Sequence, residues 1–198
     1  MRNLFVLIAA ASALAAPAAA QAPSQRTQAV FAGGCFWCTE SDFDKIPGVL
    51  STTSGYIGGK VARPTYEQVS AGGTGHIEAV RVVYDPTKVS YAALANRFFR
   101  TIDPLDANGQ FCDRGDQYRS AIFVADAGQR QIAAAAKAKA AAALKKPIAT
   151  LILPGTTFYP AEAYHQDYYK KNPAKYRFYR WNCGRDARLK AVWSKVAS

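Results

Sequence analysis

The sequence predicts a single domain of the α+β class. Short runs rich in β-branched and aromatic residues alternate with stretches of helical periodicity, and in one place two strand-like runs follow each other with only a loop between them. Of the 198 residues, 49% are apolar and 12% are aromatic. This composition can bury a sizeable core and excludes intrinsic disorder for most of the chain, and one domain is the usual outcome at this length.

The first half of the chain predicts three strands and one helix. Strands are expected where β-branched and small residues gather before glycines, and the helix ends at Ile46-Pro47-Gly48. The elements are strand Ala29–Ala32, helix Phe36–Lys45, strand Val49–Ile57 and strand His76–Tyr84. Lys60–Gly75 is expected to be a long glycine-rich loop, and a loop of that length inside a domain is often functional.

The second half predicts two further helices and two further strands. Ser90 caps a helix that runs through Thr101, and Asp126 precedes an alanine-rich helix. The elements are helix 90–101, a polar turn-rich stretch 101–117, strand Tyr118–Val124, helix Gln129–Lys146 and strand Ala149–Leu153. The order βαββαβ, followed by a helix and a strand, predicts a ferredoxin-like split βαβ sandwich with additions.

The N-terminus has the features of a secretory signal peptide. Arg2 precedes an apolar run, and Ala18-Ala19-Ala20 offers a cleavage site near Ala20. We therefore expect residues 1–20 to be a signal peptide, 21–28 a linker and 29–198 one catalytic domain, with no membrane-spanning segment in the mature chain. Export to the periplasm is the expected location, an oxidising compartment in which thiol pairs form or cycle.

The C-terminal segment 164–198 is basic and aromatic, within a chain of net charge +11. Basic residues interleaved with rings suit single-stranded nucleic acid, but they equally suit an extended tail that wraps the domain with its rings while its charges stay solvated. We expect the second arrangement and no nucleic-acid partner. A module that binds anionic envelope surfaces is the remaining alternative for this segment.

The chemistry concentrates at Gly33-Gly34-Cys35-Phe36-Trp37-Cys38, where a strand runs into two glycines and a cysteine stands at the start of a helix. Free N–H groups and the helix dipole favour a thiolate there, so we expect a depressed pKa and a nucleophilic Cys35. Cys35 and Cys38 also have the C-x-x-C spacing of thiol–disulfide oxidoreductases, and a general exchange activity is the alternative function. No second pair of ligands has zinc spacing, so no metal is expected.

Several separated motifs in order resemble the A-type peptide methionine sulfoxide reductases. The resemblance covers about Ala29 to Pro173. The motifs are Gly-Cys-Phe-Trp at 34–37 with Glu40, Gly-Tyr-Ile-Gly-Gly at 55–59, Pro-Thr-Tyr at 64–66, Thr-Gly-His-Ile-Glu-Ala-Val at 74–80, Asp-Arg-Gly at 113–115, Gln-Tyr-Arg-Ser at 117–120 and His-Gln-Asp-Tyr at 165–168.

The resemblance implies reduction of the S epimer of methionine sulfoxide, free or in oxidised proteins. It implies that Cys35 attacks the sulfoxide sulfur, that Glu78 protonates the departing oxygen, and that Tyr66 and Tyr118 hydrogen-bond that oxygen. Asp113 matches a polar residue that supports the site. Phe36 and Trp37 match the apolar wall that receives the ε-methyl group. His76 and His165 are expected to be structural.

Elementary chemistry agrees with these implied roles. A sulfoxide oxygen leaves only when protonated, and a carboxyl group can supply that proton only if burial raises its pKa. The attack leaves a sulfenic acid, which a second thiol converts to a disulfide, and an external dithiol such as thioredoxin must then reduce that disulfide. We expect no cofactor, and a monomer.

The chain departs from the common family pattern at its thiols. Cys38 stands where many members have glycine, and the usual glycine-rich, cysteine-bearing tail is replaced by a basic aromatic tail with Cys183. Candidates for the resolving thiol are therefore Cys183 on a flexible arm next to Gly184, Cys38 on the same helix as Cys35, and Cys112 beside Asp113. Cys183 is the preferred candidate, with Cys38 the other main one.

Overall fold

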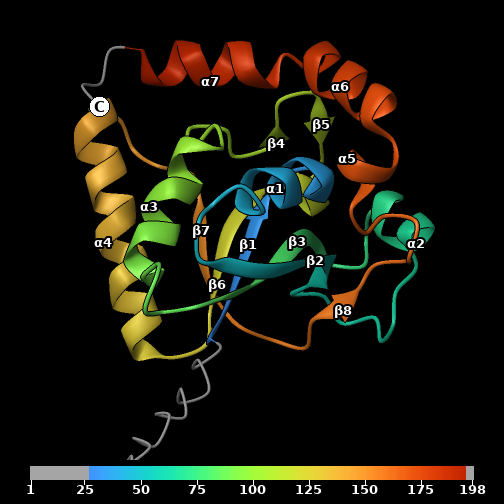
Figure 1. Cartoon of the computed structure of the whole chain (residues 1–198), viewed down its shortest axis with the longest axis horizontal. Helices are drawn as coiled ribbons and strands as arrows, with labels where there is room; N and C mark the ends of the chain where they lie inside the picture. The colour runs from blue at the N-terminus through green and yellow to red at the C-terminus, as the bar shows by residue number, and fades with distance from the viewer. Residues whose placement is uncertain (1–26, 195–198) are drawn as a thin grey trace, which may run out of the picture.

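The computed structural model describes residues 27–194, which form one six-stranded sheet covered by helices (Figure 1). The strand order is β7-β6-β1-β3-β2-β8. The strands are β1 (Thr27–Gly33), β2 (Val49–Ile57), β3 (Ile77–Tyr84), β6 (Ser120–Val124), β7 (Leu151–Pro154) and β8 (Tyr159–Pro160). The longer helices are α1 (Phe36–Phe43), α3 (Tyr91–Arg100) and α4 (Ala127–Leu144).

The predicted split βαβ arrangement is confirmed in the middle of the sheet. The four central strands lie in the order β6, β1, β3 and β2, and each neighbouring pair is antiparallel. If these four strands are counted along the chain, their order across the sheet is 4-1-3-2. Each βαβ unit therefore has one strand of the other unit inserted between its own two strands. β7 adds to the β6 edge in parallel, and β8 adds to the β2 edge antiparallel.

The main core lies between one face of the sheet and the helices α1, α3 and α4. Alternate residues of a strand face opposite sides, so Phe31 of β1 packs against Phe43 of α1 and Phe98 of α3, with ring centroids 4.7 and 5.2 Å away, whereas Ala32 belongs to a smaller cluster on the opposite face. Side-chain oxygens of Ser90 and Asp126 accept hydrogen bonds at the starts of α3 and α4, as the sequence predicted.

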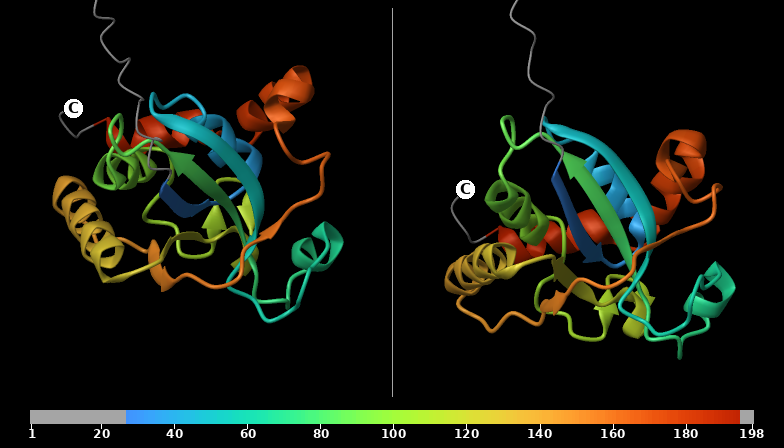
Figure 2. Two further views of the ribbon diagram at one scale, coloured as in Figure 1. Left: turned by 60° about the horizontal axis from the view of Figure 1, so that its bottom comes forward. Right: turned by 90° about the horizontal axis from the view of Figure 1, so that it is seen from below.

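The stretch expected to be a long loop contains a short helix, α2 (Tyr66–Ser70), which stands apart from the other helices (Figure 2). Its first turn is fixed by a capping box, since Thr65 accepts from the backbone of Gln68 while the Gln68 side chain accepts from the backbone of Thr65. The sequence prediction of a glycine-rich loop over residues 60–75 did not include this helix. The result is that Tyr66 is placed on a rigid turn.

Two other parts of the chain also differ from expectation. Tyr118 ends a 3-10 helix (Asp116–Tyr118) and not a strand, because β6 begins only at Ser120. The polar stretch before it forms a small ribbon of two-residue strands, β4 (Gly109–Gln110) and β5 (Asp113–Arg114). Gly115, with φ of +117°, joins this ribbon to the 3-10 helix.

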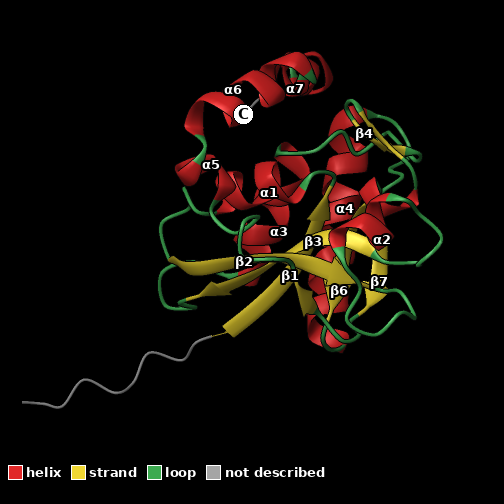
Figure 3. Cartoon of the chain, turned by 90° about the vertical axis from the view of Figure 1, so that its right-hand side faces the viewer, coloured by secondary structure: helices red, strands yellow, loops and turns green. Residues whose placement is uncertain are grey.

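The C-terminal segment is not extended but forms three helices. They are α5 (Tyr168–Lys171), α6 (Pro173–Asn182) and α7 (Arg185–Trp193), and Figure 3 shows α6 and α7 on the same side of the sheet as α1, with α1 beneath them. Pro173 is well suited to a first helical position, and Gly184, with φ of +63°, separates α6 from α7. His165 lies in the turn before α5.

A buried arginine and a disulfide hold this segment to the domain. The Arg185 guanidinium donates to the backbone oxygens of Gly33 (3.2 Å) and Thr101 (2.7 Å), and Cys183 is joined to Cys112. Both contacts lie at the end of the sheet where β1 leads into α1. The tail is therefore part of the active-site end of the fold.

The predicted signal peptide at residues 1–20 lies outside the described residues. The predicted linker 21–28 overlaps the fold, because β1 begins at Thr27. In the span from Thr27 to Ser194, none of the helices combines the length and the apolar character that crossing a membrane requires.

Candidate active site

The candidate nucleophile lies where β1 passes into α1. Gly34 has φ of +79°, and a Cβ there would stand 2.5 Å from Cβ of Gln110, so the turn requires glycine. Cys35 is the N-cap of α1, and its backbone oxygen accepts from the N–H groups of Cys38 (3.2 Å) and Thr39 (3.3 Å). This geometry points the Cys35 side chain into a cavity beside the first turn of the helix.

That cavity brings together all the catalytic and substrate-binding residues expected from the sequence. It has a volume of about 60 Å³ and is lined by Cys35, Phe36, Trp37, Tyr66, Glu78, Asp113, Tyr118 and Tyr179. The lining comes from α1, α2, β3, the β4–β5 ribbon with its following 3-10 helix, and α6. Seven of these residues were expected here, and Tyr179 was not.

Glu78 is a buried carboxyl group held against the nucleophile. It is the second residue of β3 and only 2% exposed, and its Oε2 accepts the backbone N–H of Phe36 at 3.0 Å. Burial raises the pKa of Glu78 to about 8, although the Phe36 hydrogen bond opposes this. The group is therefore mostly protonated at neutral pH, as its expected role as a proton donor requires.

Cys35 and Cys38 are both free thiols and both buried, 6% and 1% exposed. The sequence argument expected a depressed pKa at Cys35. The structure corrects this, because burial raises the pKa of Cys35, with the neighbouring Cys38 and the carboxyls of Glu78 and Asp113 adding to the rise. The hydrogen bond with Cys35 lowers the pKa of Cys38 to about 7, so the two sulfurs act as a pair that shares a proton.

Tyr66 and Tyr118 provide hydroxyl groups on the side of the cavity that faces Glu78. Burial raises the pKa of Tyr66 to about 12 and raises that of Tyr118 further, so both hydroxyls stay protonated at any pH at which the protein works. Glu162 holds Tyr66 in place through its backbone N–H (2.8 Å). Two O–H donors therefore line the same cavity as the Glu78 carboxyl.

Asp113 and Tyr179 are joined across the mouth of the cavity. The Tyr179 hydroxyl donates to Oδ2 of Asp113 at 2.6 Å, and burial raises the pKa of the Asp113 carboxyl. Burial raises the pKa of the Tyr179 hydroxyl, and the neighbouring Cys35 and Asp113 add to the rise. Tyr179 is not predicted from the sequence, where the tail shows only as a run of charges and rings. Helical spacing in α6 was the signal that was available, since Tyr176 and Tyr179 share its inner face.

The apolar wall formed by Phe36 and Trp37 is supported from the turn before α5. Trp37 Nε1 donates to Nδ1 of His165 at 3.0 Å, and the Trp37 ring stacks on Tyr168 with centroids 3.7 Å apart. His165 lies 4.9 Å from the Phe36 ring and 4.5 Å from the Tyr66 ring. Burial lowers the pKa of His165, which keeps its ring neutral and able to accept from Trp37. His165 thus positions the wall.

His76, the other histidine expected to be structural, lies away from the cavity. Nδ1 accepts the backbone N–H of Gly59 at 3.2 Å, and Nε2 pairs with the backbone oxygen of Val61 at 2.7 Å. It therefore fastens the segment between β2 and α2.

The remaining two cysteines are joined to each other. Cys112, in the turn between β4 and β5, forms a disulfide with Cys183 at the end of α6, so Cys183 is paired with Cys112 in this structure and Cys38 is the thiol beside Cys35. Within residues 27–194, one group of possible metal ligands comes together, Cys112, Asp113 and Cys183, and its two sulfurs are bonded to each other.

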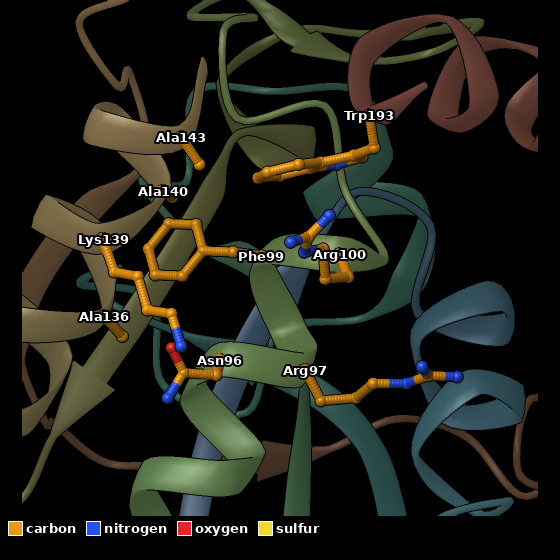
Figure 4. Close-up of a pocket in the computed structure, with 9 residues that line it drawn as sticks. All are labelled: Asn96, Arg97, Phe99, Arg100, Ala136, Lys139, Ala140, Ala143 and Trp193. Carbon is orange, nitrogen blue, oxygen red and sulfur yellow. The ribbon is translucent and has the colours of Figure 1, made fainter. Parts of the chain in front are cut away.

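A larger hollow lies elsewhere, between α3, α4 and α7 (Figure 4). It has a volume of about 280 Å³, and the Arg100 guanidinium lies over the Trp193 ring at 4.2 Å from its centroid. Its lining holds arginine, lysine and alanine side chains but neither a thiol nor a carboxyl group. The cavity at Cys35 is smaller, yet it is the one that places a thiol, a protonated carboxyl and fixed hydroxyls together.

Known proteins match this chain over nearly all of its described length. The family model for peptide methionine sulfoxide reductase matches residues 27–197. Peptide methionine sulfoxide reductase MsrA 2 of Caulobacter vibrioides is 54% identical over 195 residues, which cover 98% of this chain and 99% of the relative. The protein of the same name from Rhizobium meliloti is 53% identical over 169 residues, 85% of this chain and 84% of the relative.

Solved structures are similar as well. Methionine sulfoxide reductase A of Corynebacterium diphtheriae aligns with a TM-score of 0.67 at 37% identity, over 77% of each chain. The reduced form of Mxr1 from Saccharomyces cerevisiae aligns with a TM-score of 0.73 at 33% identity, over 77% of this chain and 89% of that one.

Proposed function

The chain belongs to the peptide methionine sulfoxide reductase family, so thiol-dependent reduction of methionine sulfoxide is its activity, and we propose that it reduces the S epimer with Cys35 as the nucleophile. The observation that carries the assignment of residues is the small cavity that holds the Cys35 thiol, the protonated Glu78 carboxyl and two tyrosine hydroxyls. A chiral sulfoxide has one oxygen, one methyl and one side-chain arm, and each finds a different surface there.

In the proposed complex the sulfoxide oxygen lies toward Glu78, Tyr66 and Tyr118, and the ε-methyl group lies against Phe36 and Trp37. The sulfur then faces Cys35. In the R epimer, the same placement of sulfur and oxygen directs the methyl group away from the aromatic wall. Discrimination between the epimers follows from this three-point arrangement.

The first chemical step joins the Cys35 sulfur to the sulfoxide sulfur while the Glu78 proton passes to the oxygen. In this adduct the hydroxyl group then passes from the methionine sulfur to the Cys35 sulfur as the bond between the two sulfurs breaks, which releases methionine and leaves Cys35 as a sulfenic acid. Because Glu78 is neutral before the reaction, it places no negative charge beside the Cys35 thiolate as that thiolate forms. Tyr66 and Tyr118 stabilise the charge that develops on oxygen, without reorganisation.

We propose that Cys38 resolves the sulfenic acid. Its sulfur attacks Cys35, water leaves, and a Cys35–Cys38 disulfide forms. The proposal is supported by the contact between the two thiols and by the lowered pKa of Cys38, and C-x-x-C pairs at a helix start close readily into disulfides. The sequence argument preferred Cys183, but Cys183 is bonded to Cys112 in this structure.

The disulfide must be reduced by an external dithiol, and we propose a thioredoxin-like protein in this role, with no prosthetic group. Mxr1, one of the similar solved proteins, has also been crystallised in complex with Trx2. General thiol–disulfide exchange through Cys35 and Cys38 is less well supported, because both sulfurs are buried and a protein disulfide does not fit a cavity of about 60 Å³.

We further propose that the enzyme is exported and repairs oxidised proteins of the periplasm. The basis is the signal-peptide pattern of residues 1–20. Mass measurement of the mature chain recovered from the periplasmic fraction tests this, with cleavage near Ala20 expected. Intact chain retained in the cytoplasm contradicts it.

The decisive experiment measures reduction of S- and R-methionine sulfoxide with excess dithiothreitol. We expect turnover of the S epimer alone, abolished by Cys35→Ser. Cys38→Ser is the matched control, because it removes the other thiol of the pair while leaving the nucleophile, and dithiothreitol can reduce the sulfenic acid directly. Turnover of the R epimer, or full activity of Cys35→Ser, contradicts the proposal.

A further inference from the structure

We propose that the outer face of α6 docks on the surface of an anionic phospholipid membrane. In this proposal the Phe178 and Trp181 rings enter the headgroup layer, and Lys175 and Arg177 pair with lipid phosphates. The inference goes beyond the sulfoxide chemistry and does not depend on it. Three features of the structure carry it: two exposed rings, cations without ion-pair partners beside them, and the firm attachment of α6 to the domain.

Two neighbouring aromatic rings of α6 point outward. Among residues 27–194, Trp181 and Phe178 are the most exposed large apolar side chains, at 74% and 65%. They are three residues apart on one face of α6, with ring centroids 6.0 Å apart, and Figure 1 shows α6 at the edge of the molecule. The sequence predicted that the rings of the tail pack inward. Tyr176 does so, but these two rings form an apolar patch that is open to another surface.

The charges beside these rings favour an anionic partner. Lys175 precedes Phe178 by three residues and Arg177 precedes Trp181 by four, so each ring has a cation next to it on the helix surface. Both cations are exposed, and within residues 27–194 neither takes part in an ion pair. Their charges are therefore available to an anion from outside the protein.

A groove beside Trp181 adds a place for one such anion. It lies between α6 and the start of α7, has a volume of about 250 Å³, and is lined by Arg177, Arg180, Trp181, Gly184, Asp186 and Ala187. The Arg180 guanidinium is already paired with Asp186 at 2.6 Å. Arg177 is thus the cation of this groove that can donate to a lipid phosphate, while Trp181 lies against the apolar part of the same lipid.

The helix presents this face without any further folding. Arg180 of α6 donates through Nη1 to Asp42 of α1 at 3.0 Å, and the disulfide between Cys183 and Cys112 holds the end of the helix. Pro173 suits the first helical position at the other end. The rings are therefore held outward before contact, and docking does not cost the entropy of ordering a segment.

A lipid surface fits this face better than a protein partner does. Protruding rings flanked by cations are typical of helices that lie in the headgroup layer, where the rings reach the acyl chains and the cations meet phosphates. A stable protein partner needs about 800 Å² of matching surface, whereas fluid lipid adapts to protruding side chains. The net charge of +11 also attracts the chain as a whole to an anionic surface.

Docking through α6 has a consequence for the choice of substrate. Tyr179, on the same helix as the two exposed rings, lines the cavity at Cys35. The docked enzyme therefore holds its cavity about one helix diameter, roughly 10 Å, from the lipid. Oxidised methionines of proteins at the membrane surface become its nearest substrates.

Tryptophan fluorescence tests the contact at α6 directly. The full chain is mixed with vesicles of phosphatidylcholine alone or with about one-third phosphatidylglycerol. We expect a blue shift of the emission with the anionic vesicles only, because Trp181 leaves water. Trp181→Phe is expected to bind the same vesicles without this shift. Residues 1–26 contain no tryptophan, so attachment through the apolar N-terminal segment does not produce the signal.

Cosedimentation with the anionic vesicles tests the charges. Lys175→Glu/Arg177→Glu is expected to weaken partitioning by about tenfold or more, since each cation near an anionic surface contributes about fivefold. Arg130→Glu/Lys139→Glu is the matched control, because it changes the net charge equally at exposed positions of α4 and should have a much smaller effect. Activity with dithiothreitol, equal to that of the native protein, shows that both variants are folded.

Two results overturn the proposal: equal loss of partitioning in the two charge variants, or unchanged tryptophan emission of the native protein with anionic vesicles. A blue shift with polyglutamate or a single-stranded oligonucleotide but not with vesicles also overturns it and assigns the face to an acidic macromolecule. Cys35→Ser is expected to bind vesicles as the native protein does. Failure of docking and failure of the proposed function are therefore observed separately.

Discussion

The carboxyl group of Glu78 and the backbone N–H of Phe36, 42 residues apart in sequence, are joined by a hydrogen bond of 3.0 Å. Phe36 directly follows Cys35, the proposed nucleophile, so this bond holds the Glu78 carboxyl beside the first turn of α1. It also crosses from α1 to the central strand β3, the two elements that the split βαβ topology brings together. The topology therefore brings together the two residues that we propose as acid and nucleophile.

The pH dependence of kcat/KM is expected to be bell-shaped. Ionisation of the Cys35–Cys38 pair, with the pKa of Cys38 at about 7, gives the rising limb. Loss of the Glu78 proton, at a pKa of about 8, gives the falling limb, about tenfold per pH unit above that value. Steady-state rates with dithiothreitol between pH 5 and 10 measure both. A rate that keeps rising above pH 9 rules out Glu78 as the acid.

Glu78→Gln is expected to lower kcat/KM by about 10²- to 10⁴-fold, because the amide keeps the shape of the carboxyl but donates no acidic proton. The falling limb of the pH profile should disappear in the residual activity. Glu67→Gln is the matched control, since Glu67 is an exposed residue of α2 outside the cavity, and its activity should equal that of the native protein. Equal losses in both variants would remove the special role of Glu78.

Glu78→Gln is also expected to stabilise the protein at alkaline pH. The pKa of Glu78 is raised in the folded state, so the folded chain binds more protons than the unfolded chain between pH 4.5 and about 8. The free energy of unfolding therefore falls as the pH rises from 4.5 to about 8. Above this range the whole contribution of the Glu78 proton to stability is lost. Glu78→Gln has no such loss, and its advantage in unfolding free energy should grow by roughly a few kcal/mol from pH 4 to pH 9. Urea unfolding at both pH values checks this, and an advantage that does not grow contradicts it.

How far the sequence predicted this site depended on the kind of signal. Cys35, Glu78 and Tyr66 belong to local motifs, so their gathering in one cavity could be expected from the chain alone. The pKa of Cys35 could not, because its direction is set by burial and by carboxyls from distant elements that outweigh the helix N-terminus. The order of the central strands likewise followed from the order of the elements along the chain. β8 could not be predicted, because it has only two residues and so shows no alternation of apolar and polar side chains.

The tail was the part that the sequence described least well. Its charges suggested a solvated extended segment, but the buried Arg185 and a disulfide help to dock three helices beside the site. Tyr179 reaches the cavity only because α6 is held there. These contacts join segments that are distant in sequence, and the local sequence of neither segment predicts that they pack together.

Tyr179→Phe is expected to lower kcat/KM about tenfold without unfolding the protein, because it removes one hydroxyl that contacts both Asp113 and Cys35. Tyr169→Phe is the matched control. It removes a hydroxyl bonded to Asp44 at 2.8 Å, in the same tail but outside the cavity. Steady-state kinetics on both variants measure the difference. Equal activity in the two variants assigns Tyr179 a packing role only.

His165→Ala is expected to raise KM for methionine sulfoxide by about three- to tenfold with little change in kcat. The substitution removes the acceptor for Trp37 Nε1 and frees the wall that receives the methyl group, but it touches no group that moves a proton. His165→Asn, whose side-chain oxygen can accept a hydrogen bond, should recover part of the loss. A large fall in kcat with unchanged KM would instead make His165 part of the chemical step.

Arg185→Met is expected to destabilise the protein by about 3 kcal/mol or more. The side chain is 2% exposed, donates to the backbone oxygens of Gly33 and Thr101, and lies 3.7 Å from the Asp42 carboxylate, so methionine fills the volume but leaves buried acceptors without a donor. Lys190→Met, at an exposed position of the same helix, should change stability by about 0.5 kcal/mol or less. Because Gly33 leads into the nucleophile turn, activity of Arg185→Met should fall before the protein unfolds. Urea unfolding followed in parallel by circular dichroism and by activity measures both effects, and equal midpoints for the native protein and Arg185→Met would show that Arg185 does not hold the tail in place.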